Sequence, residues 1–322
     1  MPGPIVIAGS PTSLGGHFGG MERTPAELRR RGIVDSLRGR PGLAGRRIVD
    51  AGDATIEPGW APDPDPRAKN RALLIENLPR IADHVAGALD AAGPDAVLHL
   101  LGGDCTAHAA ALAGLRRRRP GRRLALAWFD AHGDFNTPAT TPSGNVWGMP
   151  FAMACGRGDP DLVAAVDGPT VRDEDAALLG GQVLDETESR SLASSLVAHF
   201  GAGMLGGPAG LAALAGWADS VAGRVDGCYV AIDMDVLDAT AGWALAMPER
   251  EGISLATAIA AVRTLAAALP VDGIGTTTIM FRPETPEPDS RRTVDAAAAL
   301  VEAALGEPAV VRSGPAVHEV AR

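Results

Sequence analysis

The chain is short of positive charge, cysteine and aromatic residues. Lys and Arg total 29 against 39 Asp and Glu, which gives a formal net charge of −10. Because nucleic-acid binders usually carry a basic excess or patch, this balance argues against a polyanion as the main partner. We interpret the one dense basic cluster, at 116–119 and 122–123, as a solvated turn. The three cysteines lie in widely separated contexts, which is not the pattern of a disulfide framework.

Segments that would direct the chain to a membrane are also missing. No apolar stretch is both long enough and free enough of charge to span a bilayer. The opening MPGPIVIAGSP has no basic region of the kind that begins a signal peptide, and it is typical of a first strand. We therefore expect a cytoplasmic protein with no membrane partner.

Short apolar runs alternate with longer helical patterns along all 322 residues. Strands that are apolar on both faces and separated by helices indicate a parallel sheet covered on both sides. Because no repeat, linker or composition break divides the chain, we expect a single domain over 1–322. Strands are predicted within 4–10, 46–52, 95–104, 123–134, 180–186, 227–235 and 271–280, and helices at 24–37, 67–91, 106–118, 189–199, 208–222, 254–269 and 289–305.

Three unusual polar clusters fall at predicted strand ends: LLGGDCTAH (100–108), WFDAHGD (128–134) and VAIDMDVLD (230–238). Residues two apart in a strand point to the same face, so Asp130, His132 and Asp134 aim at one point, as do Asp233 and Asp235. A single Asp at a strand end is often only a turn cap, but two such clusters favour a cation site. A carboxylate-rich site with few nitrogen ligands suits Mn²⁺ or Mg²⁺. Two such ions can activate a water molecule, which predicts hydrolysis.

The order GGD, DAHGD and DMD resembles the ureohydrolase family, which contains arginase, agmatinase and formiminoglutamase. The opening IVIAGSPTSLGGHFGGMERTPAELRRRG and the closing RTVDAAAALVEAALG extend the resemblance over nearly the whole chain. It implies a three-layer α/β/α sandwich with a central, mainly parallel sheet, two Mn²⁺ ions and a homo-oligomer. It assigns the metal ligands to Asp130, His132, Asp134, Asp233 and Asp235, and it makes Asp134 the candidate catalytic residue.

The chain departs from the family pattern in four places. The family motif GGDHS is GGDCT here, so Cys105 stands at a metal-ligand position. Sulfur is a poorer match to Mn²⁺ than imidazole, and we expect the ion beside it to be held more weakly; the alternative is a plain buried cysteine. Trp147 replaces the proton-shuttling His of arginases, and Phe281 is expected at the position of the Glu that holds the guanidinium. Ala239 follows Asp238, where the family continues with Pro.

The stretch DFNTPATTPSGN resembles the loop with which arginases hold the α-carboxylate of an amino acid. Agmatinases lack this pattern, so the resemblance implies an α-amino-acid substrate of arginine-like length. The alternative is an ordinary polar surface loop, which the order and spacing of the residues disfavour. The resemblance assigns carboxylate binding to Asn136, Thr141, Ser143 and Asn145, and ammonium binding to Asp185 and Glu188 in GGQVLDETE.

Taken together, the departures favour a head group that is less basic than a guanidinium. We expect Nω-hydroxy-L-arginine, which a branch of the family in natural-product pathways hydrolyses to ornithine and hydroxyurea. Two alternatives stay open: an ordinary arginase or other guanidino-acid hydrolase, and a non-catalytic homologue that binds an amino acid. The remaining histidines, at 17, 84, 99, 108, 199 and 318, are interpreted as structural or surface groups.

Overall fold

The computed structural model describes residues 2–56 and 60–306. Its strands form one eight-stranded sheet in the order β2-β1-β3-β8-β7-β4-β5-β6, and every neighbouring pair is parallel. The strands are β1 (Ile5–Ser10), β2 (Ile48–Asp53), β3 (Val97–Gly102), β4 (Leu124–Asp130), β5 (Ala176–Gly180), β6 (Ala198–Gly201), β7 (Gly227–Asp233) and β8 (Val271–Thr277). The helices are α1 (Thr24–Arg30), α2 (Ile33–Arg38), α3 (Arg71–Ala92), α4 (Thr106–Arg118), α5 (Pro150–Ala154), α6 (Pro160–Ala165), α7 (Glu186–Ala193), α8 (Ala202–Leu205), α9 (Pro208–Ala222), α10 (Leu255–Ala268) and α11 (Glu287–Leu305). The expected parallel sheet is confirmed.

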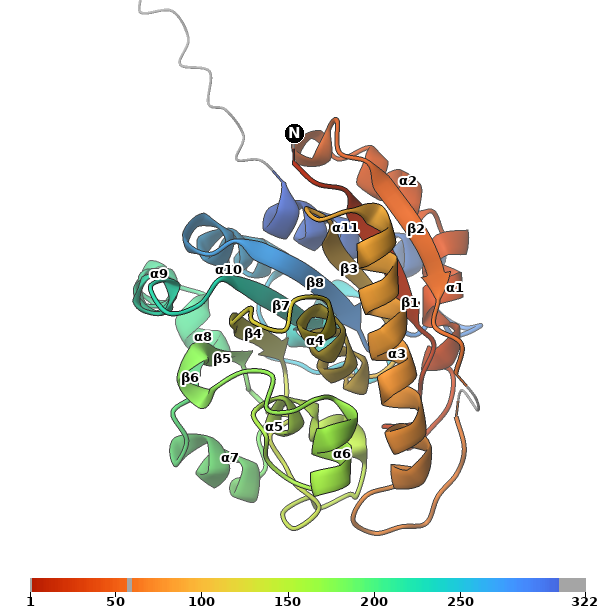
Figure 1. The fold of residues 1–322 in the computed structure, drawn as a ribbon, viewed down its shortest axis with the longest axis vertical. Coiled ribbons are helices and arrows are strands. Elements are labelled where there is room, and N and C mark those ends of the chain that lie inside the picture. The colour runs from red at the N-terminus through yellow and green to blue at the C-terminus, as the bar shows by residue number, and fades with distance from the viewer. Residues whose placement is uncertain (1, 57–59, 307–322) are drawn as a thin grey trace, which may run out of the picture.

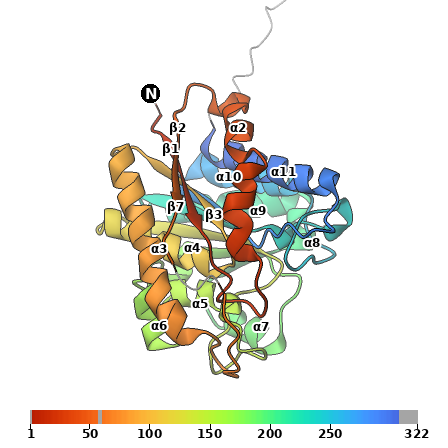
Figure 2. The same cartoon turned by 90° about the vertical axis from the view of Figure 1, so that its right-hand side faces the viewer.

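Helices cover both faces of the sheet. Figures 1 and 2 show α3, α4 and α6 on one side of the strands and α2, α9, α10 and α11 on the other. Side chains alternate accordingly along β1: Ile5 and Ile7 join the core beneath α1, α2 and α9–α11, while Val6 and Ala8 join the core beneath α3 and α4. The predicted three-layer α/β/α sandwich is therefore confirmed, and its strands are apolar on both faces because both faces are buried.

Three predicted elements differ from the structure. The strand expected at 180–186 is wrong, since β5 ends at Gly180 and a loop follows. The helix expected at 189–199 begins earlier and ends at Ala193, and its last residues belong to the edge strand β6, whose four residues are too few for a clear pattern. The helix expected at 24–37 is broken into α1 and α2 because Gly32 adopts a left-handed φ of 86°.

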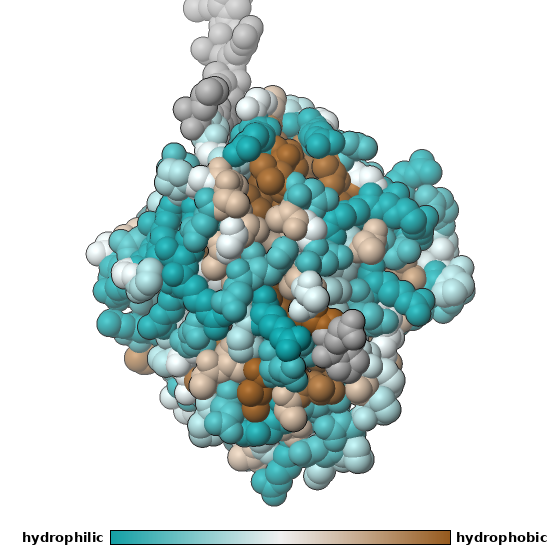
Figure 3. Space-filling model, turned by 45° about the vertical axis from the view of Figure 1, so that its right-hand side comes forward, coloured by the Kyte–Doolittle hydropathy of each residue, from teal (hydrophilic) through white to brown (hydrophobic). Residues whose placement is uncertain are grey.

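The basic cluster is not simply a solvated turn, because Arg116, Arg117 and Arg118 form the last turn of α4. Arg117 donates to Asp83 and Asp167 at 2.7 Å each, so much of its charge is neutralised within the chain. Figure 3 shows one face of the molecule as mostly hydrophilic, with small separated apolar areas. Among the described residues, no helix is both long and apolar enough to cross a membrane.

Candidate active site

The candidate site lies where neighbouring parallel strands end. β4 ends at Asp130 and β7 ends at Asp233, and these two strands pair directly in the sheet. β8 lies on the other side of β7 and β3 lies beyond it, so the loops that follow all four strands meet at one edge. Ligand sites of open parallel sheets form at this edge.

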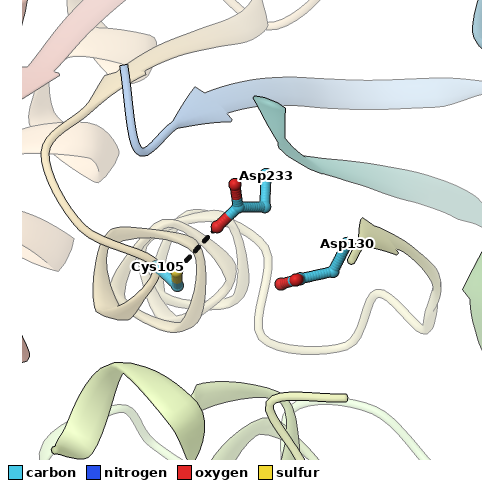
Figure 4. A group of neighbouring side chains, drawn as sticks. All are labelled: Cys105, Asp130 and Asp233. Atoms are coloured by element: carbon cyan, nitrogen blue, oxygen red, sulfur yellow. Dashed lines mark hydrogen bonds between the residues drawn. The ribbon is translucent and has the colours of Figure 1, made fainter. Parts of the chain in front are cut away.

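Cys105, Asp130 and Asp233 make the first cluster. Figure 4 shows their side chains pointing toward one another from the start of α4 and the ends of β4 and β7, and one ligand atom from each lies within 4.8 Å of the others. The Cys105 thiol donates to Oδ2 of Asp233 at 2.9 Å. The turn before it needs glycine, because a Cβ at Gly103 would lie 1.8 Å from the carbonyl oxygen of Thr12. The Cys105 side chain therefore faces the two carboxylates.

Burial and the charges of Asp233, Asp134 and Asp130 raise the pKa of the Cys105 thiol well above its usual range. The carboxylates thus oppose formation of the Cys105 thiolate. A cation between the sulfur and the carboxylates would offset this repulsion.

Asp130, His132 and Asp235 make the second cluster, which shares Asp130 with the first. Nδ1 of His132 lies 3.4 Å from Oδ1 of Asp130 and 3.3 Å from Oδ2 of Asp235. Backbone donors fix the carboxylates: the Ala131 N–H donates to Asp235 at 3.1 Å, and the His132 N–H donates to Asp130 at 2.7 Å. The imidazole and the two carboxylates are thus held close enough together to share one cation.

The other nitrogen of His132 faces Glu249, a residue that the sequence did not single out. Nε2 lies 3.7 Å from Oε1 of Glu249. The Ala239 N–H donates to the Glu249 carbonyl oxygen at 2.9 Å and so holds the Glu249 backbone in place. Proline, the family residue at Ala239, has no N–H to donate. One departure from the family motif thus anchors the segment that carries this carboxylate.

Asp134 is the third part of the carboxylate cluster. It is 3 % exposed, and its Oδ2 has no hydrogen-bond partner among the described residues. Its backbone adopts a left-handed φ of 49°. Burial and the charges of Asp130 and Asp233 raise the pKa of Asp134 well above its usual range. A buried carboxylate oxygen without a donor is costly, so it is placed to bind a cation or a reacting molecule.

These residues fit a site for divalent cations. The donor set is oxygen-rich with one nitrogen and one sulfur, and neither lysine nor arginine lines the cavity that it faces. The same repulsion raises the pKa of Asp130 and of Asp233, after burial as the first cause. Carboxylate oxygen with imidazole is the ligand chemistry of Mn²⁺.

The cavity has a volume of about 370 Å³, and all six predicted amino-acid-binding residues line it: Asn136, Thr141, Ser143, Asn145, Asp185 and Glu188. Five of the six predicted metal ligands line it as well, and Asp130 lies beneath them without reaching it. The structure therefore places both groups of residues, drawn from positions 105 to 235, around one cavity.

Asp185 and Glu188 are joined by the start of α7. Asp185 caps this helix by accepting from the Glu188 N–H at 2.8 Å, and it also accepts from Nδ2 of Asn136 at 2.7 Å. Glu188 accepts from the backbone N–H groups of Gly133 at 3.2 Å and Phe135 at 3.0 Å. Burial raises the pKa of Glu188 to about 7, although these donors lower it. The two carboxylates are thus presented to the cavity in a fixed geometry.

Two sequence-based assignments need correction. Phe281 does not line the cavity, because its ring packs against Arg31, whose guanidinium carbon lies 4.4 Å from the ring centroid. Thr278, directly after β8, lines the cavity and donates to Asp233. His17 is also part of the cavity wall, and it contacts the edge of Trp147 with ring centroids 5.2 Å apart. Of the histidines that we interpreted as structural or surface groups, His318 lies outside the described residues.

Both errors have a physical origin. The Phe281 assignment rested on an alignment that runs past the end of a strand. The register of such an alignment can shift by a few residues, because the sheet and not the sequence fixes which side chain faces the cavity. His17 lies in a glycine-rich loop without periodicity. Its only sequence signal was its place after the first strand of a parallel sheet, where ligands bind.

Comparisons with known proteins agree with this geometry. A model of the arginase family matches residues 4–306. Arginase from Bacillus caldovelox is 28 % identical over 308 residues, which cover 94 % of this chain and 98 % of that protein. Its solved structure matches with a TM-score of 0.82 over 95 % of this chain and 99 % of that chain. Arginase from Bacillus cereus matches with a TM-score of 0.81 and 25 % identity over 95 % of this chain and 99 % of that chain. The chain belongs to the arginase family, a family of amidinohydrolases that act on guanidino compounds.

Proposed function

We propose that this amidinohydrolase uses Mn²⁺ and prefers Nω-hydroxy-L-arginine, which it hydrolyses to L-ornithine and hydroxyurea. One observation carries the proposal: a single cavity is lined by the six amino-acid-binding candidates, by Cys105 with the carboxylates, and by the neutral Thr278. The first group suits an α-amino acid. Cys105 and Thr278 differ from the residues that we expect in a site specific for arginine.

The two clusters provide places for two ions with Asp130 between them. Cys105 and Asp233 would complete the first place, and His132 and Asp235 the second; Asp134, outside both clusters, would be a further ligand. Bound Mn²⁺ ions would supply Lewis acidity that lowers the pKa of a water molecule held between them. Because sulfur suits Mn²⁺ less well than imidazole, we expect the ion beside Cys105 to be the weaker one.

The chain's own residues orient the substrate and move the proton. Asp185 and Glu188 hold the α-ammonium, and the α-carboxylate is held by Asn136, Thr141, Ser143 and Asn145. The oxygen of the attacking water forms a bond to the guanidino carbon while the electron pair of the carbon–nitrogen double bond moves to its nitrogen. The Oδ2 atom of Asp134 accepts one water proton, and the other passes to that nitrogen as the C=O bond of hydroxyurea forms. The bond from this carbon to the δ-nitrogen breaks, and this nitrogen takes the proton from Asp134. L-Ornithine and hydroxyurea are released, and no other co-reactant is needed.

The neutral residue beside Asp233 supports the choice of head group. Thr278 donates a hydrogen bond and offers no negative charge to a guanidinium. Losing one hydrogen bond to a buried cation costs about 1.5–3 kcal/mol, roughly a ten- to hundredfold loss in rate against arginine. The hydroxyl of a hydroxyguanidine withdraws electrons, so this head group can bind as the neutral form and loses less. Trp147, which cannot carry a proton, is consistent with the same preference.

Steady-state kinetics on three compounds tests the proposal. With Mn²⁺ at matched pH, we expect a higher kcat/KM for Nω-hydroxy-L-arginine than for L-arginine, and little activity on agmatine. Equal efficiency on the two amino acids would reject the preference and leave an ordinary arginase. That second candidate is favoured by the relatives, which are named arginase. If the Mn²⁺-loaded protein releases neither urea nor hydroxyurea, the alternative of a homologue that binds an amino acid without turnover is supported.

Two wider expectations belong to the same proposal. We infer that residues 1–322 act as one domain, because the loops that line the cavity follow β1, β3, β4, β5, β7 and β8 of one sheet. The homo-oligomer and the cytoplasmic location stay predictions, which size measurement and cell fractionation would check.

A further inference from the structure

Lys69 is the only lysine of the chain, and it lies against the predicted amino-acid-binding loop. Its Nζ donates to Oδ1 of Asn145 at 3.0 Å, and its backbone N–H donates to the Gly144 carbonyl oxygen at 2.9 Å. Lys69 precedes α3, so the entry to that helix is joined to the loop by both side chain and backbone. Asn145 itself is 7 % exposed and lines the cavity.

The positive charge of Lys69 is not neutralised by a neighbouring acid. Within the described residues, no carboxylate lies within ion-pair distance of its Nζ, whereas Arg71, two residues on, pairs with both Asp159 and Asp161. The cavity is lined by carboxylates without a lysine or an arginine among the lining residues. Lys69 places a positive charge directly behind Asn145, a residue of the cavity wall.

Lys69 also decides which way the Asn145 amide points. An ammonium group has only donors, so the amide oxygen must face Lys69; the reverse orientation would set the amide NH₂ against the ammonium group. Nδ2 of Asn145 then lies 3.4 Å from Nδ1 of His17. Burial and the charge of Lys69 lower the pKa of His17, which favours a neutral ring with a free Nδ1 acceptor. The second hydrogen on Nδ2 is left for the cavity.

We propose that Lys69 is a positioning residue for the α-carboxylate of the substrate. It fixes the Asn145 amide with its NH₂ group toward the cavity and places a lysine charge behind that amide. The inference rests on the proposed function, because it requires a substrate with an α-carboxylate. It goes beyond the loop residues that the family resemblance assigns, since Lys69 lies outside that loop.

A double-mutant cycle on ligand binding tests this role. The dissociation constant of L-ornithine, the expected product, is measured by calorimetry on the Mn²⁺-loaded wild type, Lys69→Met, Asn145→Ala and the double variant. We expect Lys69→Met to weaken binding about tenfold, as for one charge-assisted hydrogen bond. The double variant should bind no more weakly than Asn145→Ala alone, because Lys69 acts through that amide. Lys69→Arg, which keeps the charge, should recover most of the affinity.

Kinetics adds a readout that a merely structural role would not move. Lys69→Met should raise KM for the amino-acid substrate about tenfold while kcat changes less than about twofold. The exposed neighbour Arg67 supplies the matched control, and Arg67→Met should bind L-ornithine as the wild type does. Wild-type affinity in Lys69→Met, or additive losses in the cycle, would overturn the role of Lys69 and leave the proposed function intact. A wild type that does not bind L-ornithine would overturn both.

Discussion

The Cys105 thiol donates a 2.9 Å hydrogen bond to Oδ2 of Asp233, and Asp130 lies on the other side of the same small space. Family members with GGDHS place an imidazole at this position. A sulfur donor keeps the position occupied by a ligand-type atom, but it changes how strongly a hard cation is held. We therefore propose that Cys105 sets the metal affinity of this chain apart from that of relatives with histidine at this position.

We predict that Cys105→His binds the first Mn²⁺ ion more tightly and shifts activity toward L-arginine. Imidazole is the better ligand for Mn²⁺. Two firmly bound Mn²⁺ ions should support hydrolysis of the more basic guanidinium. Metal content after dialysis and kcat/KM on both amino acids check this. Cys105→Ser is the matched control for size. If both variants keep wild-type metal content and activity, Cys105 is only a packed core residue.

Thr278 provides a second test of substrate choice. Thr278→Glu places a carboxylate on the cavity wall beside Asp233, and we expect kcat/KM for L-arginine to rise about tenfold relative to hydroxyarginine. The backbone can accept the change, because Thr278 already has a φ of 55°, which is more strained for a β-branched residue than for Glu. Kinetics on both substrates measures the shift.

Phe281→Glu is the control for that experiment, because this residue packs against Arg31 away from the cavity. It should leave the ratio of the two kcat/KM values unchanged. A shift in Phe281→Glu, with none in Thr278→Glu, would restore the position that the sequence alignment favoured.

The sequence was enough to predict the sheet and the clustering of acidic side chains at its edge, because both rest on local patterns. Strands such as β4 and β7 are continuous apolar runs that end in Asp residues, so their type, their end and the direction of their carboxylates follow from one pattern. The edge strand β6 has four residues, of which only Phe200 is buried, and no periodicity can be read from so short a run.

Contacts that depend on the tertiary fold could not be predicted from the sequence. Glu249 comes beside His132 through the loop after β7, and Lys69 reaches Asn145 from the segment before α3. Neither residue belongs to a motif, and the sequence separation between partners is large. His17 lies in a glycine-rich loop whose path is set by close backbone packing, which spacing alone does not encode.

Removing one carboxylate should abolish metal binding and activity together. Asp233→Ala deletes a member of the first cluster and the acceptor of the Cys105 and Thr278 hydrogen bonds, and it leaves donors without a partner. We expect less than about 1 % of the wild-type kcat/KM, since a loss of about 3 kcal/mol already costs more than a hundredfold. Elemental analysis and kinetics check both effects. Asp238→Ala, which changes an acid outside both clusters, should keep metal and activity. An Asp233→Ala variant that retains Mn²⁺ and turnover would contradict the proposed role of Asp233 as a metal ligand that activity requires.

The crowded carboxylates also predict how stability depends on pH when the metal is removed. Burial and mutual repulsion raise the pKa of Asp134, Asp233 and Asp130 above the ordinary value of 3.8. The folded chain therefore binds more protons than the unfolded chain between this value and the raised pKa values, and its stability falls as the pH rises through that window. We expect the Tm of the chelator-treated protein to drop by several degrees between about pH 5 and pH 8. Added Mn²⁺ should remove most of the slope, because the ions compensate the repulsion.

A neutral isostere separates this electrostatic effect from packing. Asp134→Asn keeps the shape of the side chain and removes one of the repelling charges, so at about pH 8 it should raise the Tm of the chelator-treated protein. The same change removes a carboxylate that faces the ions, so the rise in Tm on adding Mn²⁺ should be smaller than in the wild type. Thermal melts with chelator and with Mn²⁺ give both values from one sample. Asp238→Asn, which changes an acid outside both clusters, should change neither. A chelator-treated Asp134→Asn that melts below the wild type would show that the carboxylate is stabilising without metal, which contradicts a site built to hold cations.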